Sequence, residues 1–246
     1  MIVRALLVRG MIAGLAAGVV AYLFARFFGE PPLDGGIAFE DAMAAASDEH
    51  AHEELVSRAV QANVGLGVAY VVYGVAIGGI LALVFAVARG RLAPLGSRST
   101  AVVVTLLGFV SAVLVPLVKY PANPPASTAD DTIGSRTGLF LLMVVVSIAL
   151  MVVAVVASER LTPRLGRWNA VVAAGVGYLV VTLVVGSLLP AVAETPADFP
   201  ATVLYDFRAA ALGAQVVVWG VFALVFGALV HERSPAEGTA RRAAVG

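Results

Sequence analysis

The stretch AVQANVGLGVAYVVYGVAIGGILALVFAVA, residues 59–88, runs for 30 residues without one charged side chain. A helix needs about 20 mostly apolar residues to cross the ~30 Å hydrocarbon core of a bilayer, because each residue rises about 1.5 Å. This segment is therefore long enough to span a membrane as a single helix.

Four further charge-free intervals follow this stretch, with 20, 22, 26 and 22 residues. Before it, only 16 uncharged residues separate Arg9 from Arg26, but residues 10–28 reach full length if the Arg26 guanidinium extends to the interface. We expect an all-α integral membrane protein with a membrane domain over residues 1–232 and a disordered cytoplasmic tail over 233–246. The six expected transmembrane helices are residues 10–28, 64–88, 101–118, 138–157, 170–189 and 209–230, with an outer loop over 30–57.

The first apolar segment has an alternative interpretation. Arg4 and Arg9 precede it, as basic residues precede the apolar part of a secretory signal peptide. However, no small-x-small cleavage site follows it. Gly10, Gly14 and Gly18 repeat at four-residue spacing, which is typical of a helix that packs against another transmembrane helix. We therefore expect a retained helix and keep the signal peptide as the alternative.

Composition excludes several classes of protein. Apolar residues make up 60% of the chain and charged residues 13%, whereas soluble domains have about 25% charged residues. The absence of cysteine excludes disulfides, thiolate metal sites and cysteine nucleophiles. The only lysine, Lys119, follows Val118, so no phosphate-binding loop of the Gly-Lys-Ser/Thr type exists. We expect no enzyme, no bound cofactor and no nucleic-acid partner.

Charged residues are distributed unevenly between the two sides of the six predicted helices. Eleven basic and three acidic residues fall on one side, a net charge of +8, and five basic and 13 acidic residues fall on the other, a net charge of −8. The more basic side is cytoplasmic by the positive-inside rule, which places both termini inside a multi-pass protein of the plasma membrane. The inner basic residues are Arg4, Arg9, Arg89, Arg91, Arg98, Arg160, Arg164, Arg167, Arg233, Arg241 and Arg242.

The three outer loops resemble one another. Each outgoing helix is expected to end in a proline-rich stretch, at residues 30–32, 119–125 and 194–200, and each returning helix begins near an arginine: Arg58, Arg136 and Arg208. Three helix-hairpin repeats would explain this pattern. The simpler explanation is that proline ends helices and arginine anchors them at interfaces.

The five later spans contain no ionisable residue, which argues against a proton pump with a carboxylate relay in the membrane. Their polar residues are mild hydrogen-bonding groups that we expect to join one helix to another. They are Asn63, Tyr70, Tyr73, Thr105, Ser111, Ser147, Tyr178, Thr182, Ser187 and Gln215.

The densest group of metal-ligand side chains lies in the first outer loop. If Ser47 caps a helix, Asp48 faces His52 and His50 faces Glu54 at i, i+4; in an extended strand His50 and His52 share one side. Imidazole and carboxylate ligands suit a borderline divalent ion such as cobalt, nickel or zinc. An ordinary solvated surface is the alternative. The candidate metal ligands are Asp48, Glu49, His50, His52, Glu53 and Glu54.

Two segments resemble the CbtA family of predicted cobalt transporter subunits. One is VPLVKYPANPP at 115–125, followed by DTIGSRTGLFLLM at 131–143; the other joins Leu189-Pro190 to FPATVLYDFR at 199–208, with Gln215 and Trp219. The similarity covers nearly the whole chain, from Arg4 to Val230.

The resemblance implies a membrane permease subunit for cobalt uptake, linked to cobalamin and working with a small single-span, histidine-rich CbtB-like partner. Family members carry a His/acid-rich segment in the first outer loop, corresponding to Glu49, His50, His52 and Glu53. We expect Co²⁺ as the transported substrate, and homo-oligomers are compatible with this role. The alternatives are a non-transporting scaffold of a metal-transport complex and a transporter of Ni²⁺ or Zn²⁺.

We expect the metal to pass from the histidine cluster to a proline-rich outer mouth. Proline-interrupted backbone leaves carbonyl oxygens that can replace water around an ion. Arg136 and Arg208 would shape this mouth by pairing with Asp130 or Asp131 and with Asp198 or Asp206. Its other expected residues are Lys119, Tyr120, Pro121, Asn123, Pro124, Phe199, Pro200 and Gln215.

Overall fold

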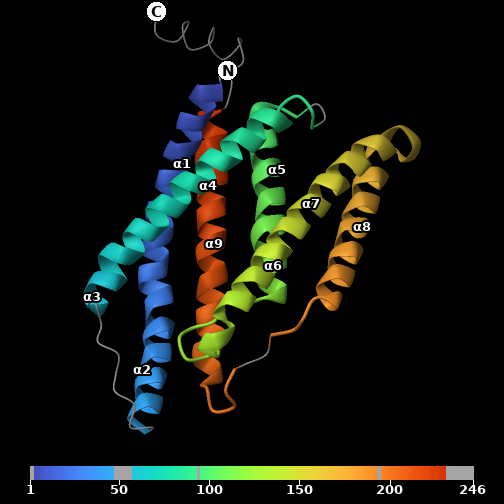
Figure 1. Ribbon diagram of the computed structural model, residues 1–246. Helices are drawn as coiled ribbons and strands as arrows, with labels where there is room; N and C mark the ends of the chain where they lie inside the picture. Colours follow the sequence, from blue (N-terminus) through green and yellow to red (C-terminus); the bar gives the residue numbers. More distant parts are fainter. Residues whose placement is uncertain (1–2, 47–56, 93–94, 193–194, 231–246) are drawn as a thin grey trace, which may run out of the picture. The chain divides into compact units, whose positions relative to one another are not determined.

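The computed structural model describes residues 3–46, 57–92, 95–192 and 195–230 (Figure 1). Within these ranges the chain forms helices and no strand. Six helical stretches are long and apolar enough to cross a membrane, which confirms the all-α prediction with six spans. Contacts divide the chain into two compact units, which are described separately.

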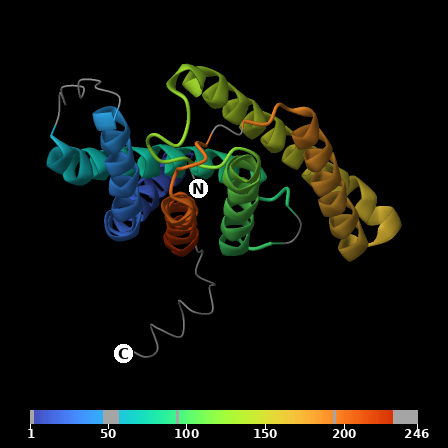
Figure 2. The same cartoon turned by 90° about the horizontal axis from the view of Figure 1, so that it is seen from below.

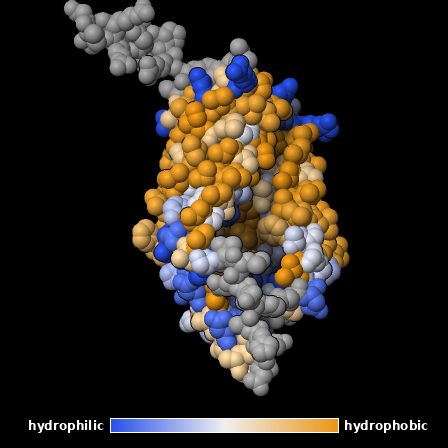
Figure 3. Space-filling view, turned by 60° about the vertical axis from the view of Figure 1, so that its left-hand side comes forward, coloured by the Kyte–Doolittle hydropathy of each residue, from blue (hydrophilic) through white to orange (hydrophobic). Residues whose placement is uncertain are grey.

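Unit 1 comprises Met1–Val20, Val68–Leu106 and Val218–Gly246. It contains parts of four helices: α1 (Val3–Phe24), α4 (Leu66–Ala88), α5 (Ser97–Phe109) and α9 (Ala201–Leu229). In the face shown in Figure 3, hydrophobic residues cover most of the helical surface and hydrophilic residues gather toward helix ends. This distribution suits helices whose middle parts face lipid.

Glycines bring α1 and α4 into backbone contact. A Cβ built on Gly14 would overlap the carbonyl oxygen of Gly74, and one built on Gly10 would overlap that of Gly78. The reverse also holds, because a Cβ on Gly74 would meet the carbonyl oxygen of Gly14. Only residues without a side chain permit such an approach, which is why small residues are enriched where transmembrane helices pack. The predicted packing face of the first helix is confirmed.

Aromatic side chains fill another part of unit 1. The Phe85 and Phe226 rings meet edge to face with centroids 5.3 Å apart, and Phe222 stacks on Phe226 at 5.1 Å. All three side chains are almost fully buried. They join α4 to α9 through apolar contact.

Unit 2 comprises Ala21–Gly67 and Leu107–Val217, and its first helix continues past the point where the sequence predicted a loop. A π-helical turn, Ala25–Gly29, leads directly into α2 (Glu30–Ala46). The prediction that Glu30-Pro31-Pro32 ends the helix and opens a loop is therefore wrong for residues 30–46. Prolines are tolerated in a first turn because those N–H groups need no helical partner, and here the π-turn restarts the helix just before them.

The next two outer helix segments also contain π-helical turns. Gln61–Gly65 separates α3 (Arg58–Val60) from α4, and Val110–Leu114 separates α5 from α6 (Val115–Lys119). In the second case Pro116 lacks the N–H that an α-helix needs at that position, which favours the irregular turn. The remaining turn before the α7 helix is a 3₁₀ segment at Asp130–Thr132.

Helices α7 (Ile133–Leu165) and α8 (Arg167–Leu188) form an antiparallel hairpin and lie side by side in both views (Figures 1 and 2). Only Gly166 separates them, and its φ of 74° requires glycine. The predicted helices 138–157 and 170–189 left residues 158–169 as the connection between them. This prediction is wrong because α7 and α8 extend through these residues, with Pro163 accommodated inside the last turns of α7.

The mild polar residues bond mainly within their own helices. Ser147 and Tyr178 form a 2.7 Å hydrogen bond between α7 and α8, as expected of groups that join helices. In contrast, the Thr105 hydroxyl donates to the Ala101 carbonyl of its own helix, and Ser111 and Ser187 do the same at their positions. Local bonding of this kind satisfies a hydroxyl in an apolar surrounding without a second helix.

Candidate functional site

The predicted histidine cluster, residues 48–54, lies outside the described residues. Among the described residues, no group of three or more His, Asp or Glu side chains could hold a metal ion. The described part of unit 2 instead contains two polar arrangements that the proline-rich segments position.

The first arrangement is a buried carboxylate. Glu30, at the start of α2, is only 3% exposed and forms an ion pair with Nη2 of Arg58, which begins the returning helix. Asp34 lies one turn further along α2, and its carboxylate accepts from Nη2 of Arg58 at 2.8 Å and from Nε at 3.1 Å. Because a buried carboxylate is costly without a partner, Arg58 is what makes Glu30 tolerable at this position.

A second arginine connects the same two helices. Nε of Arg26 donates to Oδ1 of Asn63 at 3.2 Å, and both residues belong to π-helical turns. The Asn63 amide in turn donates to the Ala59 carbonyl at 2.7 Å, taking an acceptor that an α-helix would give to a backbone N–H. This side-chain bond explains a π-turn in a segment without proline.

The π-turn and the two prolines at the start of α2 leave backbone acceptors without a helical donor, and the Phe27 carbonyl is one of them. The Glu30 N–H donates to the Ala25 carbonyl, five residues back. The Phe27 carbonyl would need an N–H from residue 31 or 32, and both are proline. Neither an α-helical nor a π-helical bond to this oxygen can form. Freed carbonyls of this kind coordinate cations in interrupted transmembrane helices.

The second arrangement is the segment 119–125, KYPANPP, which follows α6. The Lys119 ammonium donates to the Leu189 carbonyl at 3.1 Å, and the Tyr120 hydroxyl donates to the Pro190 carbonyl at 2.9 Å. Tyr120 is buried, and burial raises the pKa of its hydroxyl above the ordinary value, which keeps it a donor. The segment is thereby tied to the end of α8.

Arg208 of α9 holds the middle of the same segment. Its Nη2 donates to Oδ1 of Asn123 at 2.7 Å and its Nε to the Ala122 carbonyl at 3.3 Å. We expected Arg208 to pair with Asp198 or Asp206, and this is wrong: both carboxylates are exposed and form no salt bridge with it. Arg208 prefers neutral oxygens because the proline-rich backbone presents carbonyls that no helix uses.

The end of the segment packs on α2. Pro124 and Pro125 lie against Gly36, where a Cβ would come within 3.1 Å of Pro124. Nearby, the Phe39 ring meets Phe199 edge to face, with centroids 4.9 Å apart. Extending the helix to Ala46 therefore gives the proline-rich segments 119–125 and 194–200 a common packing partner in α2.

The remaining predicted mouth residues are not gathered at one point. Arg136 donates to the Thr132 hydroxyl at 3.1 Å and to the Ala129 carbonyl at 3.3 Å. Asp131, Pro121 and Pro200 are exposed, and Gln215 is half-buried in α9. The Asp130 side chain lies outside the described part of the chain.

Sequence reasoning missed the Glu30, Asp34 and Arg58 arrangement. Treating the two prolines as the first turn of a new helix would have placed Glu30 and Asp34 on one face at i, i+4, open to the first basic residue of the returning helix. That signal was present, but proline was interpreted only as a helix end.

Comparison with known proteins identifies a matching family. The sequence profile of the CbtA family, described as "Probable cobalt transporter subunit (CbtA)", matches residues 3–231, nearly the whole chain. No curated protein and no solved structure shows a significant match.

Proposed function

Because the chain belongs to the CbtA family of probable cobalt transporter subunits, we propose that it is the permease subunit through which Co²⁺ enters the cell. The observation that carries this proposal is the family match over residues 3–231, joined to six apolar membrane-spanning helices. A transporter role fits a protein without an enzymatic motif. We place it in the plasma membrane.

The family description is of a subunit, so the chain works with a partner. We propose that this partner is a small single-span, histidine-rich protein of the CbtB type. Such a protein could supply metal ligands that the described residues lack. Because the inner loops are short, any energy-coupling module would also have to come from another chain.

Metal capture is proposed for the His50 and His52 cluster, with Asp48, Glu49, Glu53 and Glu54. Thirteen acidic residues are assigned to the outer side, and such a charge raises the local concentration of divalent cations. The positive charge of Arg58 partly cancels the negative charges of Glu30 and Asp34. These two carboxylates therefore attract cations less strongly than the unpaired acidic residues do.

Beyond the capture cluster, backbone oxygens are better candidate ligands than the side chains of segment 119–125. The side chains of Lys119, Tyr120 and Asn123 are already bonded to neighbouring elements. The Phe27 carbonyl, in contrast, has no helical donor. We propose that segment 119–125 holds the rim of the mouth while freed carbonyls contact the ion.

Cobalt accumulation in cells that lack other cobalt uptake tests the proposal. We expect the wild-type chain with its partner to restore accumulation, and the variant His50→Ala/His52→Ala to lose most of it. The matched control is His231→Ala, which removes the third histidine of the chain and should leave uptake intact. Unaltered uptake in the double variant would remove the histidine cluster from the mechanism.

A second candidate is a non-transporting scaffold for a metal-transport complex. It is favoured by spans without ionisable residues and by the lack of an energy module. Liposomes containing the purified chain and a cobalt-quenched dye separate the two, because a scaffold gives no metal-dependent quenching. Parallel assays with Ni²⁺ and Zn²⁺ establish which ion the protein prefers.

A further inference from the structure

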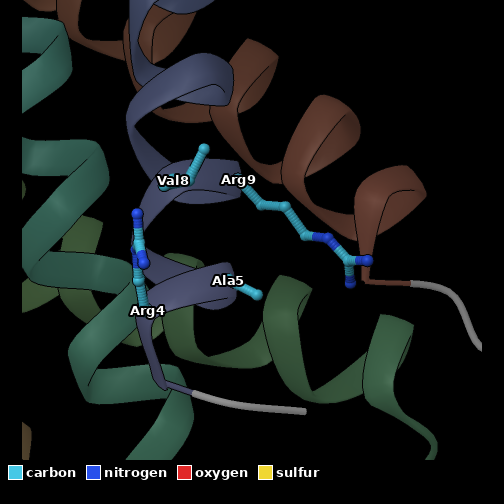
Figure 4. Close-up of a pocket in the computed structure, with 4 residues that line it drawn as sticks. All are labelled: Arg4, Ala5, Val8 and Arg9. Atoms are coloured by element: carbon cyan, nitrogen blue, oxygen red, sulfur yellow. The ribbon is translucent and has the colours of Figure 1, made fainter.

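The hollow at the start of α1 keeps its two positive charges apart. It is lined by Arg4, Ala5, Val8 and Arg9, and Figure 4 shows the two arginine side chains extending to opposite sides of the helix. A single ligand therefore cannot bridge both guanidinium groups. Polar side chains do converge at another place, the hairpin of α7 and α8.

The contact between α7 and α8 is largely polar. Six residues of the two helices are buried, and three of them carry a hydroxyl group. These are Ser147 of α7 and Tyr178 and Thr182 of α8. Because lipid offers no hydrogen-bond partner, each of these hydroxyls needs a partner inside the hairpin.

Thr182 has no such partner among the described residues. The residue is only 5% exposed, and its Oγ1 atom is fully enclosed without a hydrogen bond. Other hydroxyls of the spans donate to their own helix, as Thr105 does to the Ala101 carbonyl, but Thr182 does not. An enclosed hydroxyl without a partner is costly, and ordered water commonly supplies the missing bond.

A second unused donor lies opposite Thr182. Met143 of α7 faces Gly186 of α8, so one helical turn closer to the end of the hairpin brings Ser147 opposite Thr182. Ser147 and Tyr178 share a 2.7 Å hydrogen bond, which uses only one of their two hydroxyl hydrogens. The other hydrogen has no acceptor in the described part of the chain.

Space for a small ligand lies beside these hydroxyls. Outside its own helix backbone, a Cβ added at the buried Gly186 would meet no atom closer than Cε of Met143, at 3.9 Å. A methyl group would fit there, and a water molecule is of similar size. Because helical side chains lean toward the N-terminus, this space lies over the turn that carries Thr182.

We propose that a buried water molecule occupies this space and bridges α7 to α8. It exchanges hydrogen bonds with the Thr182 hydroxyl and with the Ser147–Tyr178 pair, which together supply the about three bonds that a buried water makes. Water fits better than a cation, since these spans contain no acidic residue to balance a charge. The inference goes beyond the proposed transport function and does not depend on it.

The test uses the full chain in detergent and the nearly isosteric variant Thr182→Val, which removes the hydroxyl. With water bound, this variant breaks one of its hydrogen bonds and should raise the equilibrium constant for unfolding about fivefold. Titration with SDS, followed by tryptophan fluorescence, measures the constant. A more stable Thr182→Val variant would overturn the proposal, because in a dry space the substitution only removes an unsatisfied hydroxyl.

The variant Gly186→Ala distinguishes the water from a Thr182 hydroxyl that bonds within its own helix. Its methyl group fills the space and excludes the water. Thr182→Val should therefore stabilise the chain in the Gly186→Ala background, although it destabilises the parent. An equal loss of stability in both backgrounds would overturn the proposal.

Hydroxyl-radical labelling, read by mass spectrometry, detects the water itself, because radicals formed from a bound water attack the ring beside it. Tyr178 is only 6% exposed, yet we expect it to be labelled in the parent chain and to lose most of the label in Thr182→Val. The matched control is Thr105→Val, which removes a hydroxyl bonded within its own helix and should leave Tyr178 labelling unchanged. An unlabelled Tyr178 in the parent chain, or equal labelling in Thr182→Val, would overturn the proposal.

Discussion

At the scale of single residues, Arg58 forms ion pairs with two carboxylates of unit 2, those of Glu30 and Asp34. It faces a carboxylate that is 3% exposed and another that is largely in water. Removing one partner of a buried pair costs far more than removing both, because the remaining charge has no counterion. The asymmetry between Glu30 and Asp34 makes this arrangement easy to test.

We predict that Arg58→Gln lowers the free energy of unfolding by about 3 kcal/mol, since Glu30 is left without a counterion. The double variant Glu30→Gln/Arg58→Gln should recover most of this loss. Asp34→Asn serves as the control and should have little effect, because exposed ion pairs contribute little. Thermal unfolding in detergent, followed by tryptophan fluorescence, measures all three. A double variant no more stable than Arg58→Gln alone would contradict the prediction.

At the scale of elements, the π-turn before α2 sets the direction in which the faces of α2 point. It inserts one residue beyond α-helical geometry, and each residue turns a helix by about 100°. Gly36 and Phe39 reach Pro124 and Phe199 only in this register. The two prolines therefore influence packing several residues away from themselves.

We predict that Pro31→Ala/Pro32→Ala restores α-helical bonding and rotates α2 away from Phe199. The chain has no cysteine, so the pair Phe39→Cys/Phe199→Cys can be cross-linked with a short bifunctional maleimide without background. The cross-link should form readily in the parent chain and fall sharply with the prolines replaced. The pair Ser147→Cys/Tyr178→Cys, on the α7–α8 hairpin, should be unaffected. Equal cross-linking of Phe39→Cys/Phe199→Cys in both backgrounds would contradict the prediction, because it would show that the π-turn does not determine which face of α2 points toward Phe199.

Charge-free intervals were sufficient to find the six apolar helices, because the cost of placing a charge in lipid dominates such sequences. They were not sufficient to find α2 or the Arg58 pair. Glu30 and Arg58 are separated by 28 residues along the chain, and their meeting depends on a helix that passes through two prolines. Likewise, the oxygens that bind Arg208 belong to the non-helical segment 119–125. The orientation of groups in such a segment cannot be predicted from a periodic pattern of apolar residues.

At the scale of the whole molecule, the six predicted spans divide the zero formal net charge into +8 on one side of the membrane and −8 on the other. The described residues of unit 1, with arginines and no acidic side chain, agree with one end of that polarity. In membrane proteins a charge distribution of this kind orients the chain during insertion, and a strongly acidic side attracts cations.

We predict that Ser135→Cys reacts with a membrane-impermeant maleimide in intact cells, because it precedes Arg136 on the proposed outer side. Ser99→Cys, beside Arg98 on the proposed inner side, should react only after the membrane is permeabilised. Both residues are exposed, so a lack of labelling cannot be attributed to burial. The opposite pattern would reverse the orientation.

The glycine contact between α1 and α4 limits how this protein can move. The backbones of α1 and α4 touch at Gly14 and Gly74. If one helix slid along the other by one residue, a side chain would clash with a carbonyl group of the neighbouring helix. The two helix segments must therefore travel as a single rigid body. Any conformational change that admits an ion on one side and releases it on the other has to leave this pair intact and occur among the other helices.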